Sequence, residues 1–71
     1  MTPKFSANSM IMDFMVLGKK YNCDRRAAID FSIISINKTL SALRNAGVDI
    51  ENNIYKYYEE IKQELKKQES K

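Results

Sequence analysis

The sequence has 71 residues, with 12 Lys and Arg against 9 Asp and Glu, and a formal net charge of +3 at pH 7. This length fits one domain, and so small a domain buries only about 60% of its unfolded surface, which makes its core small. Because histidine is absent and Cys23 is the one cysteine, the composition excludes an internal disulfide, Cys-His catalysis and the familiar zinc sites.

Residues 4–8 are expected to form a short β-strand. Polar and apolar side chains alternate here, which is the period of a half-buried strand, and Pro3 suits a strand start. One short strand needs a partner, and the same strand of a second subunit would complete an antiparallel ribbon. The apolar side chains would face the dimer core, namely Phe5 and Ala7. The polar side chains would face outward, namely Lys4, Ser6 and Asn8.

A two-stranded ribbon fits the major groove of B-DNA, where lysine suits guanine acceptors and asparagine suits adenine. The three outward side chains are therefore candidate base-reading residues. The alternative is a frayed N-terminus in which the alternation is incidental, because terminal residues are often poorly ordered.

A first helix is expected over residues 10–21, with Ser9 as its N-cap. Apolar side chains cover most of its circumference, so it must be buried on several sides. The core of a symmetric homodimer would provide that burial, and the large apolar share of so short a chain also favours association. The alternative is a surface that binds a lipid or a protein partner.

A tight turn is expected to separate this helix from a longer one over residues 25–46, which Gly47 ends. Asn22 tolerates the left-handed backbone that a helix end often needs, and Asp24 is a good N-cap for the second helix. The second helix carries one apolar stripe at spacings of three and four, formed by Ile29, Ile33, Ile36, Leu40 and Leu43.

The run from Lys19 to Ile29, Lys-Lys-Tyr-Asn-Cys-Asp-Arg-Arg-Ala-Ala-Ile, resembles the helix-turn-helix centre of ribbon-helix-helix DNA-binding proteins, the Arc and MetJ repressor class. The resemblance covers about residues 4–43. It implies an intertwined homodimer whose ribbon reads bases and whose second helix places its N-terminus, with Arg25 and Arg26, on a DNA phosphate. The expected dimer core contains Phe5, Ala7, Phe14, Ile29, Ile33, Ile36 and Leu40.

Other interpretations of the same stretch stay open. An ordinary αα-hairpin gives a similar pattern. Both arginines could be solvated or could pair with Asp13 or Asp30. Residues 35–47 also resemble the end of a winged-helix recognition helix, although no β-wing pattern follows.

A third helix is expected over residues 50–67, capped by Asp49, with an apolar stripe and an outer face of alternating Glu and Lys. It could cover the dimer core or join two dimers into a tetramer. Its tyrosines could stack on a partner, but packing is the simpler use; they are Tyr55, Tyr57 and Tyr58.

The sequence therefore predicts a mainly α fold with one N-terminal strand and three helices. Residues 1–47 would form the DNA-binding and dimerisation unit, and residues 48–71 an additional amphipathic helix. Residues 1–47 hold seven basic against three acidic groups, a balance of +4, whereas the remainder has five against six. The positive charge thus lies in the unit expected to bind DNA.

The expected function is sequence-specific DNA binding by a cytoplasmic transcription regulator, such as a repressor, or by a plasmid or phage accessory factor. The expected partners are double-stranded DNA and a second copy of the chain. No enzymatic activity, cofactor, metal, membrane or small-molecule substrate is expected. The alternative is a small helical protein-interaction module, such as a phage-type inhibitor or adaptor, that does not bind DNA.

Overall fold

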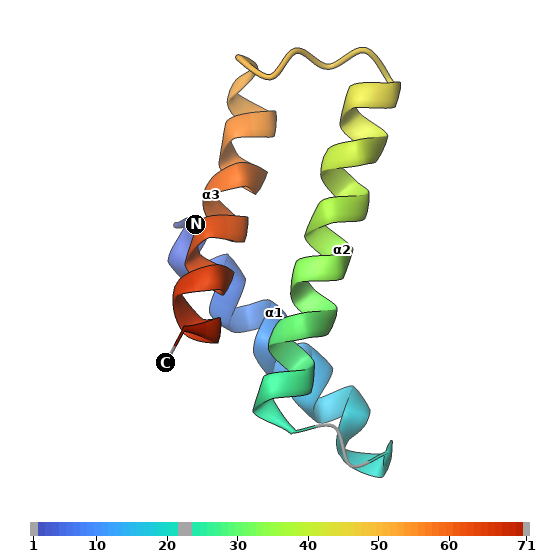
Figure 1. Ribbon diagram of the computed structural model, residues 1–71, viewed down its shortest axis with the longest axis vertical. Coiled ribbons are helices and arrows are strands. Elements are labelled where there is room, and N and C mark those ends of the chain that lie inside the picture. The colour runs from blue at the N-terminus through green and yellow to red at the C-terminus, as the bar shows by residue number, and fades with distance from the viewer. Residues whose placement is uncertain (1, 22–23, 71) are drawn as a thin grey trace.

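The computed structural model describes residues 2–21 and 24–70, and Figure 1 shows the arrangement of the helices. Helix α1 spans Pro3–Gly18 and continues into a 3₁₀ turn, η1, over Lys19–Tyr21. Helices α2 (Arg25–Asn45) and α3 (Asn53–Glu69) form an antiparallel hairpin, and α1 crosses behind its lower half. All three helices contact one another, and the molecule is elongated, measuring 37 × 21 × 21 Å.

The prediction of an N-terminal strand is wrong, because residues 4–8 lie inside α1. The Thr2 hydroxyl accepts a hydrogen bond from the backbone N–H of Phe5 at 3.1 Å, which caps the helix. Pro3 occupies the first helical position, where its missing N–H costs no hydrogen bond. Ser9, the predicted cap, therefore lies within the helix. Since the described residues contain no strand, the predicted ribbon-helix-helix fold is also wrong.

The first half of α1 is bound to α3 of the same chain. The Ser6 and Tyr57 hydroxyls form a hydrogen bond, and the Gln68 amide donates to the Asn8 side-chain oxygen at 3.2 Å. Ala7, between the two polar residues, is 1% exposed. Packing within one chain thus takes the place of the predicted pairing between subunits.

The core is built from side chains of all three helices rather than from two subunits. Its buried hydrophobic residues are Ala7, Ile11, Ala28, Ile29, Ile36, Leu40, Tyr55, Ile61 and Leu65. Ile33 and Phe14 pack against this cluster and are half-buried, whereas Phe5 is 56% exposed. Four residues of the predicted dimer core thus lie in the interior of the single chain, namely Ala7, Ile29, Ile36 and Leu40.

Small side chains line the part of α2 nearest its beginning. Ala28 and Ser32 are both 0% exposed, and the Ser32 hydroxyl donates to the Ala28 carbonyl at 2.8 Å. That bond satisfies the one buried polar side chain in the described core, so the hydroxyl carries no desolvation penalty. Short side chains at these positions let the backbone of a neighbouring helix approach closely.

Local signals set both ends of α2. The Asp24 carboxylate accepts from the Ala27 N–H at 2.8 Å, as the sequence predicts. At the other end, Gly47 has a φ of +85°, and the Val48 N–H donates to the Leu43 carbonyl at 2.9 Å, which makes a Schellman turn. The predicted turn residue Asn22 lies outside the described residues, as does Cys23.

The cap of α3 differs from the prediction. Asn52 holds the N-cap position, and its side chain accepts from the Ile54 N–H at 2.8 Å. Asp49 instead accepts from the Glu51 N–H within the preceding turn, also at 2.8 Å. A short loop therefore separates the glycine turn from α3, and the helix begins later than the sequence suggests.

Replacing Asp24 with alanine is expected to lower the free energy of unfolding by about 1 kcal/mol, because the α2 N-terminus loses its carboxylate cap. Urea unfolding followed by circular dichroism measures the change. Asp24→Asn keeps a side-chain acceptor and should lose only a few tenths of a kcal/mol. Equal losses in the two variants would show that capping is not the role of this side chain.

Candidate functional site

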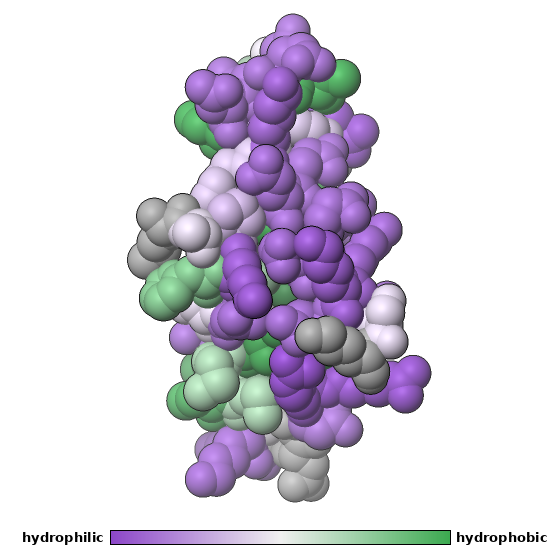
Figure 2. Space-filling model, turned by 90° about the vertical axis from the view of Figure 1, so that its left-hand side faces the viewer, coloured by the Kyte–Doolittle hydropathy of each residue, from purple (hydrophilic) through white to green (hydrophobic). Residues whose placement is uncertain are grey.

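Large apolar side chains are exposed mainly on α1 and on the first half of α2. Of the eight such residues in the part of the chain that the structure describes, six are found there, with exposed fractions from 48% to 73%: Phe5, Met12, Val16, Leu17, Phe31 and Ile34. Exposed apolar side chains that adjoin one another on a folded monomer are a common sign of a surface that binds a partner. Figure 2 shows a largely hydrophilic face over α3, with apolar side chains gathered toward the edge where α1 lies.

Three of these exposed side chains, Leu17, Phe31 and Ile34, lie at or within three residues in sequence of the contact between the Phe14 and Phe31 rings, where α1 packs on α2. The Phe14 and Phe31 rings lie 5.9 Å apart, tilted by 36°. Leu17 follows Phe14 by three residues and Ile34 follows Phe31 by three, so each pair shares one side of its helix. Leu17 is 73% exposed, Ile34 51% and Phe31 48%. We call Phe14, Leu17, Phe31 and Ile34 the α1–α2 patch.

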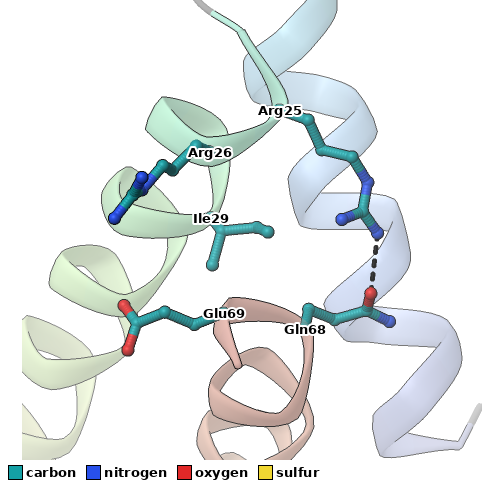
Figure 3. Close-up of a pocket in the computed structure, with 5 residues that line it drawn as sticks. All are labelled: Arg25, Arg26, Ile29, Gln68 and Glu69. Atoms are coloured by element: carbon teal, nitrogen blue, oxygen red, sulfur yellow. Dashed lines mark hydrogen bonds between the residues drawn. The ribbon is translucent and has the colours of Figure 1, made fainter. Parts of the chain in front are cut away.

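A pocket of about 400 Å³ lies at the lower end of the bundle, between the start of α2 and the end of α3. It is lined by Arg25, Arg26, Ile29, Gln68 and Glu69 (Figure 3). The Arg25 guanidinium donates to the Gln68 side-chain oxygen at 2.7 Å. In Figure 3 the two arginines extend to opposite sides, and Glu69 extends toward the side of Arg26.

The chemistry of this pocket does not favour a phosphate. The Asp24 carboxylate already accepts from an N–H of the α2 N-terminus, so an anion at that helix end would meet a negative charge. Glu69 adds a second carboxylate, and Arg25 is already bound to Gln68. Among residues 2–21 and 24–70, the ion pairs join other side chains, so neither arginine pairs with Asp13 or Asp30.

The three predicted base-reading residues do not lie on one face of α1. In a helix, positions two residues apart point about 200° apart, so Ser6 points away from the side that Lys4 and Asn8 share. Ser6 is bound to Tyr57 and Asn8 to Gln68, whereas Lys4 is exposed. Their assignment to DNA bases depended on a ribbon that the described residues do not form.

Sequence reasoning missed some contributors to these surfaces. Phe31 and Ile34 lie off the apolar stripe of α2. A large apolar residue outside that stripe could have indicated an exposed binding surface. Gln68 lies beyond the predicted end of the third helix, yet its side chain contacts both Asn8 and Arg25. The tyrosines of α3 are used for packing: Tyr55 is 5% exposed, and the Tyr57 and Tyr58 rings meet edge-on at 5.7 Å.

Comparison with protein-family models, with curated proteins and with solved structures finds no match for this chain. The surfaces are therefore interpreted from their own geometry. Among residues 2–21 and 24–70, no helix has the length and apolar content needed to cross a membrane. The same residues contain no group of three or more His, Cys, Asp or Glu side chains placed to hold a metal ion.

Proposed function

We propose that the chain is a small helical protein-interaction module that binds through the α1–α2 patch. The observation that carries the proposal is the exposure of Leu17, Phe31 and Ile34 on a molecule whose core is already complete within one chain. These side chains are not needed to close that core. Burying the exposed part of each of these side chains against a partner would contribute roughly 1–2 kcal/mol, so the patch can supply several kcal/mol of binding free energy.

DNA binding through a ribbon is not part of the proposal, because its strand lies in α1. The proposal assigns the chain no catalytic activity and no cofactor. It places the chain in the cytoplasm, which suits a sequence with a single cysteine, because one cysteine forms no internal disulfide.

Affinity capture from the cells that express the chain tests the proposal. Ile34→Glu places a charge in the α1–α2 patch, and we expect it to reduce binding of the partner by about tenfold or more. Ile54→Glu is the matched control, because Ile54 is 57% exposed on α3, outside the patch. A partner that binds the wild type and both variants equally would show that the patch is not the binding surface.

A further inference from the structure

One side of α2 carries an acid, an apolar residue and a base in regular order. Asp30, Ile34 and Lys38 are four residues apart, so they follow one another along a single ridge of the helix. All three are exposed, and Ile34 belongs to the α1–α2 patch. Asp30 and Lys38 lie about 12 Å apart along the helix axis, with Ile34 midway between them.

The two charges of this ridge have no partner within the described chain. The ion pairs found in residues 2–21 and 24–70 join Lys56 to Glu51 at 3.1 Å and Lys67 to Glu64 at 3.2 Å. Both pairs lie on α3 or in the loop before it. Asp30 and Lys38 are therefore available to a partner that approaches the patch.

This ridge is complementary to a reversed copy of itself. If two copies meet antiparallel about a twofold axis at Ile34, each Asp30 faces Lys38 of the second copy and the two isoleucines face each other. A parallel arrangement would instead bring like charges together. A twofold contact requires such self-complementarity, because the same surface is used on both sides.

The exposed area of the chain also fits a second copy. The molecule exposes 5208 Å², whereas a folded monomer of 8.3 kDa typically exposes about 4600 Å². The excess, about 600 Å², is close to the roughly 800 Å² that each partner contributes to an interface of standard size. Pairing of two copies through the α1–α2 patch would remove part of the exposed area from water.

We propose that two copies of the chain form an antiparallel dimer through the α1–α2 patch, with Asp30 of each copy paired to Lys38 of the other. The exposed Phe31 side chain, one turn before Ile34 on the same side of α2, packs beside the central Ile34 contact. This inference rests on the proposed function, because it names the partner of the same surface.

Sedimentation equilibrium of the full chain provides the first test. The wild type is expected to dimerise, and Ile34→Glu is expected to raise the dimer dissociation constant by about tenfold or more. Ile54→Glu adds the same charge at a similarly exposed isoleucine outside the patch and should leave the constant within about twofold. Circular dichroism confirms that each variant is helical.

Exchanging the charges at Asp30 and Lys38 provides a second test, whose expected result cannot arise from unfolded variants. Asp30→Lys and Lys38→Asp should each weaken the homodimer, because like charges then face each other. Mixed in equal amounts, the two variants should form a heterodimer that is about tenfold tighter than either homodimer. The double variant carrying both changes should regain dimerisation.

Three results would overturn the dimer: a wild type that stays monomeric at about 1 mM, no heterodimer in the mixture, or equal weakening by both glutamate variants. A monomeric wild type whose capture of another protein depends on Ile34 would overturn the dimer and leave the proposed function intact. If the charge-exchange variants behave as expected and affinity capture finds no other protein, the dimer is supported and the partner of the patch is a second copy of the chain.

Discussion

Replacing Ile61 with alanine is expected to lower the free energy of unfolding by about 2–5 kcal/mol. Ile61 is 2% exposed. It belongs to the core cluster through which α3 packs against both other helices. A chain of this length has a total stability of about 4–10 kcal/mol, so the loss is a large fraction of it. Thermal unfolding followed by circular dichroism should show a decrease in Tm of roughly 10–30 °C.

The matched control is Ile54→Ala on the same helix, because Ile54 is 57% exposed. It removes the same atoms with little loss of packing, so the free energy of unfolding should stay within about 0.5 kcal/mol of the wild type. Both variants should be measured at one protein concentration, since association also stabilises the folded state. A loss at Ile61 no larger than that at Ile54 would mean that α3 does not share the core.

Replacing Ala28 with leucine is expected to destabilise the molecule by about 1–3 kcal/mol or more, because the larger side chain has no space in the core. Ala28 is 0% exposed and lies beside Ser32 in the part of α2 lined by small side chains. Leucine ranks directly after alanine in helix propensity, so the expected loss of stability comes from packing rather than from helix propensity. Urea unfolding of the full chain measures it.

The control for this overpacking is Ala42→Leu, at an exposed position of the same helix. There the added side chain extends into solvent, and the free energy of unfolding should change by less than about 0.5 kcal/mol. If Ala28→Leu unfolds at the same urea concentration as Ala42→Leu, the core around the beginning of α2 would have to be looser than the structure shows.

The second helix was the most predictable element, because its signals are local. Asp24 caps its beginning and Gly47 follows its end, so the predicted range of 25–46 is one residue longer than Arg25–Asn45. The third helix was predicted over 50–67 and is observed at Asn53–Glu69. Its beginning was misplaced because Asp49 and Asn52 are both good caps and lie three residues apart.

The N-terminal element was mispredicted because five residues are too few to distinguish the two-residue period of a strand from the 3.6-residue period of a helix. An alternation over residues 4–8 fits a strand and also fits about one and a half turns of a helix. The Thr2-Pro3 pair is a helix-start signal that the strand interpretation overlooked. The helix is also held by Tyr57 and Gln68, and no local pattern reveals contacts so distant in sequence.

The site was less predictable than the helices. The sequence shows that α1 is apolar around most of its surface, but the position at which α1 crosses the hairpin decides which of its side chains remain exposed. On α1, Leu17 is exposed for that reason while Ile11 is buried; on α2, Ile34 lies off the apolar stripe and is exposed, whereas Ile36 is buried. The predicted dimer residues therefore lie mostly in the interior, and only Phe14 among them belongs to the α1–α2 patch.

The contacts that hold α1 also bear on the order of folding. Ser6 and Tyr57 are 51 residues apart in sequence, and Asn8 and Gln68 are 60 apart. Helices α2 and α3 are joined by a short loop, so their pairing loses less loop-closure entropy and can form first. Docking of the first half of α1 on α3 is then a late event. The contact between Phe14 and Phe31 spans only 17 residues, so the α1–α2 patch can form in a partly folded chain before α1 is bound to α3.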